Sequence, residues 1–273
     1  MKKLILEFEE YLRQEEKSNI TIEKYLRDVE KFSRFVGSND VTKETVIEYK
    51  KSLIESGYAT RSINSMLASL NNFLTYAGYA DCKVKSMKMQ RQIYCAEEKE
   101  LTKAEYLRLL NAAKQQTRLY YILQTICGTG IRVSELSYFT VEAVSTGEVV
   151  VFCKNKRRTI LLPGKLRKSL MKFAKQQGIY SGIIFQTKSG KPINRSNIWS
   201  DMKKLCKRAG VNASKVFPHN LRKLFARTFY RIEKDIAKLA DILGHGSIDT
   251  TRIYIMTTGV EHRKKIEQLG LVV

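Results

Sequence analysis

The segment that says most about the fold of this chain is GTGIRVSEL, at residues 128–136. Three further segments follow it in order: PHNLR at residues 218–222, LGHG at residues 243–246, and one tyrosine, Tyr254, nine residues after His245. Each has an ordinary explanation alone, because a lone arginine near a helix end is usually a surface charge, and one tyrosine among 14 is usually part of a core. The information therefore lies in the order and spacing of the whole set.

The charge of the chain is strongly positive and unevenly distributed. Its 273 residues carry a net charge of +22, which usually indicates a polyanionic partner. Residues 1–97 hold 16 Lys and Arg against 14 Asp and Glu, whereas residues 98–273 hold 33 against 13. A merely solvated basic surface would be spread more evenly. We therefore expect the C-terminal two-thirds of the chain to supply most of the attraction for a polyanion.

The first 80 residues predict four helices, because apolar residues recur there at helical spacing. The four stripes are Leu4, Ile5, Phe8, Tyr11 and Leu12; Ile22, Tyr25, Leu26, Val29, Phe32 and Val36; Val46, Tyr49 and Leu53; and Ile63, Met66, Leu67, Leu70, Phe73, Leu74 and Ala77. Gly37, Gly57 and Gly78 stand where helices should end. Since each helix has one apolar face, a four-helix bundle is the expected packing.

The helical periodicity is lost over residues 81–98, which predicts a linker between two domains. A capping box formed by Thr102 and Glu105 then marks the start of a helix. Residues 148–153 and 158–162 predict two strands joined by a tight basic turn. The sequence beyond them is mostly helical, so we expect an α-rich second domain with a small sheet.

Several classes of protein are not indicated. No apolar run approaches the roughly 18 residues of a transmembrane helix. The five cysteines are widely spaced, which predicts free thiols in a reducing cytoplasm. The sequence has no phosphate-binding loop of the kind that ATP-using enzymes carry, and no cluster of ligands with metal spacing. We therefore expect neither a cofactor nor a metal.

The ordered set of motifs resembles the signature of the tyrosine recombinase and integrase family. The flanks agree, since residues 101–110 resemble the opening of that family's catalytic domain and residues 250–254 resemble its nucleophile segment. The resemblance covers about residues 98–273 with high specificity, and it is nearest in style to Xer-type recombinases and short integrases of bacterial mobile elements. It extends more loosely over the N-terminal helices, which look like the family's core-binding domain.

The resemblance implies a mainly α fold with a small β-sheet. Residues 1–80 would form a helical core-binding domain that contacts DNA, residues 81–98 a linker, and residues 99–273 an α-rich catalytic domain that carries a β-hairpin. A tail begins at about residue 260 and ends in apolar residues. Such a tail can pack on its own domain, but in this family it tends to dock on the neighbouring protomer, which is the expectation here.

The resemblance also implies a role for each residue of the set. Tyr254 would attack phosphorus and form a 3′-phosphotyrosine. Arg132 and Arg222 would bind the phosphate, because a guanidinium group donates two parallel hydrogen bonds and keeps its charge. His219 would act as an acid or base beside the nucleophile. His245 would donate to the scissile phosphate and help to place Tyr254.

Four further positions remain to be assigned. Glu135 either supports the site from behind the arginines or forms an ordinary helix salt bridge. The family's catalytic lysine, which would protonate the leaving 5′-oxygen, lies on a β-hairpin and matches Lys154. One residue of the hairpin is missing here, however, and this leaves Lys156 as a rival. Lys223 stands where many relatives carry histidine, and we expect this change to be tolerated.

The predicted function is site-specific DNA recombination, in integration, excision, inversion or resolution. One alternative is a non-catalytic DNA-binding protein of the same fold, but the fact that all the expected catalytic positions are filled argues against it. The other alternative is a type IB topoisomerase, whose motif spacing differs. The implied partners are double-stranded DNA with short inverted-repeat sites and further copies of the chain, as a tetramer in the synapse. A partner recombinase or a directionality factor is also possible. The expected location is a bacterial-type cytoplasm, at the nucleoid.

Overall fold

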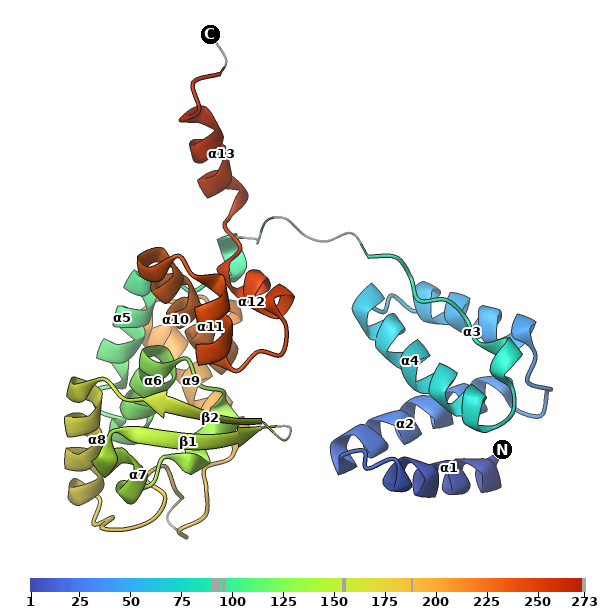
Figure 1. Cartoon of the computed structure of the whole chain (residues 1–273), viewed down its shortest axis with the longest axis horizontal. Helices are drawn as coiled ribbons and strands as arrows, with labels where there is room; N and C mark the ends of the chain where they lie inside the picture. The colour runs from blue at the N-terminus through green and yellow to red at the C-terminus, as the bar shows by residue number, and fades with distance from the viewer. Residues whose placement is uncertain (90–93, 95–96, 154–155, 188, 272–273) are drawn as a thin grey trace. The chain divides into compact units, whose positions relative to one another are not determined.

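The chain packs as two units, Met1–Arg91 and Gln92–Val273, each with its own apolar core (Figure 1). The computed structural model describes residues 1–89, 94, 97–153, 156–187 and 189–271.

The N-terminal unit contains the four helices that the apolar stripes predict, so this part of the prediction is confirmed. They are α1 (Lys2–Gln14), α2 (Asn19–Val36), α3 (Lys43–Glu55) and α4 (Thr60–Tyr76). Ser18 caps α2, and Thr42 forms a reciprocal capping box with Thr45 at the start of α3. The apolar faces meet in one core, where Phe8 and Phe73 pack edge to face.

The first residues of the predicted linker also pack on this bundle. A 3-10 turn, η1 (Ala80–Cys82), leads into extended chain that runs along α4. The side-chain amide of Asn71 bonds both the N–H and the carbonyl of Val84, and Asn64 does the same for Met87. Each asparagine thus replaces a strand partner for the extended backbone. The structure therefore assigns the start of residues 81–98 to the bundle.

The C-terminal unit is α-rich and carries one β-hairpin, as predicted. Its elements are η2 (Glu97–Lys99), α5 (Lys103–Ala113), α6 (Thr117–Thr129), η3 (Val133–Tyr138), α7 (Val141–Thr146), β1 (Glu148–Cys153), β2 (Lys156–Leu161), α8 (Gly164–Gln176), α9 (Arg195–Ala209), η4 (Ala213–Lys215), α10 (Pro218–Glu233), α11 (Ile236–Leu243), α12 (Ile248–Ile255) and α13 (Gly259–Glu267). The capping box of Thr102 and Glu105 opens α5, as the sequence predicts.

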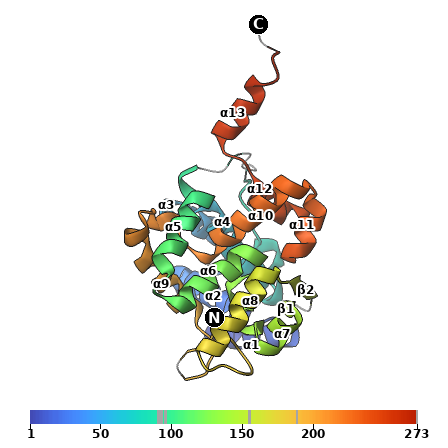
Figure 2. The same cartoon turned by 90° about the vertical axis from the view of Figure 1, so that its left-hand side faces the viewer.

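The arrangement of these elements places the chemistry-bearing segments together. Helix α10 packs against α6 on one side and against α11 and α12 on another, while the hairpin lies beside α7 and α8 (Figures 1 and 2). Helix α13 projects away from the rest of its unit in both views (Figures 1 and 2). The ends of α6 and α11 and the starts of α10 and α12 therefore meet in one region.

The β-hairpin is antiparallel, with Glu148 paired to Leu161 and Cys153 paired to Lys156. The first strand has the predicted bounds, but the second begins at Lys156 rather than at residue 158. Lys154 lies outside the described residues, and so does the side chain of Lys156. Within the described part of the chain, no helix has both the length and the apolar character needed to cross a membrane.

Candidate active site

Tyr254 and His219 lie side by side between α12 and α10. The Tyr254 hydroxyl is 3.3 Å from Nδ1 of His219, and the two ring centroids are 4.8 Å apart. Tyr254 is 8% exposed and packs in a small apolar cluster with Leu239 and Leu243 of α11. The two leucines of α11 therefore hold the phenol ring in place while its hydroxyl reaches a group that can take up a proton.

Arg222 is a buried cation held by backbone carbonyls. It is 1% exposed, and its two terminal nitrogens donate to the carbonyls of Gly130 and Leu243. Its carbon Cζ lies 5.8 Å from the centroid of the Tyr254 ring. Burial, and then the nearby charge of Arg132, lower the pKa of Arg222 to about 10, so the group stays charged at neutral pH.

Arg132 sits between a carboxylate and the end of α11. Its Nη1 donates to Oε1 of Glu135 at 3.1 Å, and its Nη2 donates to the carbonyl of Gly244 at 3.0 Å. The backbone N–H of Arg132 also donates to Oε2 of Glu135, at 2.7 Å. Glu135 is 2% exposed and holds both the side chain and the backbone of Arg132. Of the two roles left open for Glu135, this geometry favours support of the site.

His245 is locked between Arg222 and Thr251. Its Nε2 lies 3.0 Å from Nη2 of Arg222, and its Nδ1 lies 2.8 Å from Oγ1 of Thr251. A guanidinium group can only donate, so Nε2 is the acceptor and the proton of the neutral ring sits on Nδ1. In this arrangement, Nε2 of the neutral His245 ring accepts from Arg222 and has no proton of its own to donate.

Both histidines are kept neutral by their surroundings. Burial, followed by the charges of Arg222 and Arg132, lowers the pKa of His245 to about 4. Burial, followed by the charges of Lys223 and Arg222, also lowers the pKa of His219. A neutral imidazole beside a phenol can accept the phenolic proton, whereas an imidazolium cannot. His219 is therefore in the protonation state that a general base requires.

The start of the C-terminal unit is fastened to α10 next to this site. The buried carboxylate of Glu100 pairs with Lys223 and with Arg227, at 3.1 Å in each case. The pairing explains how a lysine is accommodated at position 223. It also means that Lys223, which lowers the pKa of His219, has its own counter-charge.

The structure brings together every predicted site residue that it describes: Tyr254, Arg132, Glu135, His219, Arg222 and His245. Two contributors were missed by sequence reasoning. Thr251 is fully buried and its Oγ1 lies 2.8 Å from Nδ1 of His245; its signal in the sequence is its place in the segment 250–254, three residues before Tyr254. Arg158 pairs with Glu135 but stands in a basic run in which nothing in the sequence distinguishes it.

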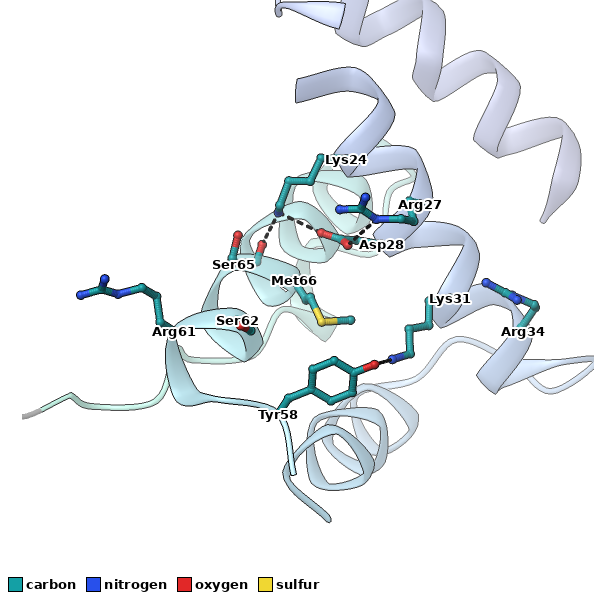
Figure 3. Close-up of a pocket in the computed structure, with 10 residues that line it drawn as sticks. All are labelled: Lys24, Arg27, Asp28, Lys31, Arg34, Tyr58, Arg61, Ser62, Ser65 and Met66. Carbon is teal, nitrogen blue, oxygen red and sulfur yellow. Dashed lines mark hydrogen bonds and ion pairs between the residues drawn. The ribbon is translucent and has the colours of Figure 1, made fainter. Parts of the chain in front are cut away.

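A second basic feature lies on the N-terminal unit. A hollow of about 620 Å³ is lined by Lys24, Arg27, Lys31, Arg34 and Arg61, together with Asp28, Tyr58, Ser62, Ser65 and Met66 (Figure 3). Lys24 is bound to Asp28, and Lys31 donates to the Tyr58 hydroxyl (Figure 3). Arg34 and Arg61 are exposed. The small net charge of residues 1–97 thus conceals a local concentration of cations between α2 and α4.

Comparison with known proteins gives consistent matches. A family model described as "Phage integrase family" matches residues 99–259, and one described as "Phage integrase, N-terminal SAM-like domain" matches residues 5–79. A Thermococcus kodakarensis protein named "Tyrosine recombinase XerA" is 28% identical, over 97% of this chain and 94% of the relative. A Halalkalibacterium halodurans protein named "Tyrosine recombinase XerD" is 27% identical, over 90% of each chain.

Solved structures resemble the whole chain. A crystal structure of XerA recombinase aligns with a TM-score of 0.56 and 25% identity, over 98% of each chain. A lambda integrase fragment bound as a dimer to a core site aligns with a TM-score of 0.76 and 17% identity, over 95% of this chain and 96% of that one. The predicted fold class, an N-terminal helical bundle and an α-rich domain with a hairpin, is therefore confirmed.

Proposed function

The chain belongs to the phage integrase family and is an enzyme of its tyrosine recombinase class, and we propose that it cuts and rejoins DNA at specific sites through Tyr254. The observation that carries this proposal is the Tyr254 hydroxyl, 3.3 Å from Nδ1 of a neutral His219, in a cluster that also holds Arg222 and His245. An unperturbed phenol with a pKa of about 10 needs such help to attack near neutral pH.

In the first step, the oxygen of Tyr254 attacks phosphorus while its proton passes to Nδ1 of His219. Negative charge then builds on the non-bridging oxygens of the phosphate. Arg132 and Arg222 neutralise it, because both stay charged and both are held at fixed positions by carbonyls and by Glu135. Arg222 Nε is buried and has no hydrogen-bond partner among the described atoms.

The bond between phosphorus and the 5′-oxygen breaks next, and this oxygen takes up a proton as it leaves. From the family pattern we assign the proton donor to Lys154, with Lys156 as the rival. The phosphodiester energy is retained in the phosphotyrosine, so a free 5′-hydroxyl of another strand can reverse the step and release Tyr254. The reaction therefore balances without ATP or another co-reactant.

The proposed partner is double-stranded DNA that carries short inverted repeats. The cations around the hollow between α2 and α4 and the large excess over residues 98–273 both attract phosphate. Helix α13 exposes Val260 and Ile266, which supports docking of the tail on a neighbouring protomer in a tetramer. Since the proposed substrate is DNA, the enzyme would act in the cytoplasm, at the nucleoid.

Covalent capture of DNA tests the proposal. Random-sequence duplexes with a nick are incubated with the protein, and those that become covalently attached are amplified and sequenced. We expect selected sites with inverted-repeat symmetry, which should also occur beside the encoding gene. Tyr254→Phe should bind the selected site but form no adduct, because only the hydroxyl is lost. Tyr180→Phe, which changes an exposed tyrosine, is the matched control and should form adduct normally.

An adduct on Tyr254→Phe would show that another residue carries the covalent bond. Two further assays, of recombination between two sites and of supercoil relaxation, distinguish a recombinase from a type IB topoisomerase and from a non-catalytic DNA-binding protein. A recombinase joins two selected sites on one plasmid, whereas a type IB topoisomerase relaxes supercoils without needing paired sites. A non-catalytic DNA-binding protein does neither.

A further inference from the structure

The C-terminal end of α11 is capped by three arginines from three separate parts of the chain. The bonds are Arg158 Nη1 to the carbonyl of Ile242 at 2.8 Å, Arg222 Nη2 to that of Leu243 at 2.6 Å, and Arg132 Nη2 to that of Gly244 at 3.0 Å. The last carbonyls of a helix lack amide partners and carry the negative end of its dipole, so cations are favourable there. Because His245 comes next in the chain, these bonds also determine where its side chain begins.

Arg158 differs from the other two because the proposed chemistry does not use it. It comes from β2, and 14% of its side chain is exposed. Its second terminal nitrogen donates to Oε2 of Glu135 at 2.6 Å, while Oε1 of the same carboxylate receives Arg132 at 3.1 Å. One negative charge is therefore shared between two guanidinium groups, one of which faces the proposed phosphate site.

The backbone before His245 also lies directly on the stem of Arg158. A Cβ atom at Gly244 would be 2.6 Å from Cδ and 2.7 Å from Nε of Arg158, and the φ angle of Gly244 is +63°. A side chain at position 244 would therefore collide with Arg158 as well as strain the backbone. The close fit ties the strand β2 to the segment that carries His245.

On the basis of the function proposed above, we propose that Arg158 is a positioning residue for the phosphate-binding charge of Arg132. Without Arg158, both oxygens of Glu135 turn to Arg132 and cancel its charge, and the carbonyl of Ile242 loses its donor. The expected defect is therefore weaker neutralisation of the transition state, on a site that still binds DNA. This differs from a loss of folding, which would slow cleavage of every substrate alike.

A substrate with an altered charge distinguishes weaker neutralisation of the transition state from a loss of folding. The captured duplex is synthesised with an ordinary phosphate or with a neutral methylphosphonate at the scissile position, and the rate of adduct formation is measured for each. The variants are Arg158→Met, which removes the charge, and Arg158→Lys, which keeps the charge but reaches one partner at a time. Arg157→Met is the matched control, because it removes a charge from the neighbouring, exposed position of the same strand. Thermal melting checks that each variant is folded.

We expect Arg158→Met to slow cleavage of the ordinary phosphate by roughly tenfold to a hundredfold and to spare the methylphosphonate, which needs less positive charge. Arg158→Lys should fall between Arg158→Met and the wild type, and Arg157→Met should leave the ratio of the two rates unchanged. An equal slowing of both substrates by a folded Arg158 variant, or no slowing, would overturn this inference alone. Absence of adduct with the wild-type chain would overturn the proposed function, and this inference with it.

Discussion

The protonation of His245 follows from which groups surround it. Its ring is half-buried, and Arg222, Arg132 and Arg158 all lie close enough to oppose a further positive charge. The hydroxyl oxygen of Thr251 then accepts a hydrogen bond from the Nδ1–H of the neutral ring. The same three arginines bind the carbonyls just before His245, so they position the histidine and keep it neutral at once. A phosphate in the site would offset their charge and raise the pKa of the ring.

This environment links stability to pH, with a definite sign. The pKa of His245 is lowered to about 4 in the folded chain, against about 6.5 for an exposed histidine. Above about pH 6.5 the ring is neutral in both states, so its contribution to stability is complete. As the pH falls from about 6.5 towards about 4, the unfolded chain takes up a proton that the folded chain refuses, and the free energy of unfolding decreases. The pKa of His219 is lowered too, which adds to this decrease.

Urea denaturation at about pH 7 and about pH 5.5 measures this effect. Both pH values lie above the pKa values of ordinary carboxylates, so the acidic side chains contribute little to the difference. We expect the wild-type chain to lose stability between the two pH values, and His245→Gln to lose less. His262→Gln, in the projecting helix α13, is the control and should keep the dependence of the wild type. An identical loss in the wild type and in His245→Gln would contradict the assignment.

Helix α10 couples the active site to the start of its unit. One face carries His219 and Arg222, and the next face carries three side chains that hold the chain ahead of α5. The contacts are Asn220 to the carbonyl of Lys99, Lys223 and Arg227 to the Glu100 carboxylate, and Arg227 to the carbonyl of Leu101. Three successive residues just after the predicted linker are thus fixed to the helix that carries two of the proposed catalytic groups.

Removing the charge of Glu100 should loosen this connection. Glu100→Gln leaves Lys223 and Arg227 partly buried without a counter-charge, and we expect a loss of roughly 1–4 kcal/mol in the free energy of unfolding. Hydrogen exchange of residues 99–101 should also accelerate, because their contacts to α10 weaken. Glu233→Gln breaks an exposed pair with Lys238 and is the matched control, with little effect expected. Unchanged exchange in Glu100→Gln would show that the carboxylate does not hold this segment.

Two packed units with very different charge make up the molecule. The C-terminal unit carries most of the positive excess, while the N-terminal unit gathers its cations around one hollow (Figure 3). Each phosphate that a protein neutralises releases a counterion, so the salt dependence of DNA binding counts such contacts. The charge distribution therefore predicts how the two units divide this dependence.

We expect the affinity for the selected duplex to fall steeply with salt, and residues 92–273 alone to keep most of the slope. Within the whole chain, Arg27→Ala and Arg61→Ala should each reduce the slope by about 1, as expected for loss of one phosphate contact. Lys51→Ala, on α3 outside the hollow, is the control and should leave the slope nearly unchanged. Fluorescence anisotropy over a salt series gives these values. A slope that disappears when residues 1–91 are removed would show that the bundle, not the C-terminal unit, supplies the phosphate contacts.

The sequence alone predicted the four N-terminal helices and the hairpin, and it named a set of residues that the structure brings together. Helical stripes such as Phe8 and Leu12, and the capping box of Thr102 and Glu105, depend on neighbours within one or two turns, which the local sequence specifies. The ordered motifs identified Tyr254 and its partners because a whole set of residue types at given spacings is unlikely to arise by chance. The division into 1–80, 81–98 and 99–273 stays a prediction, and so does the choice of Lys154 over Lys156.

The tertiary structure alone decided which charged side chains are buried and which distant groups they contact. Arg158 meets the carbonyl of Ile242 across 84 positions of the chain, and Lys223 meets Glu100 across 123. Neither contact has a local signature, since an arginine in a basic run and a lysine on a helix have the same local pattern whether they are exposed or buried. Asn71 and Asn64, which hold residues 84 and 87 on the bundle, likewise have no local sequence pattern that predicts these contacts. Burial and long-range pairing arise only when distant segments pack, and they set the charge and the protonation of this site.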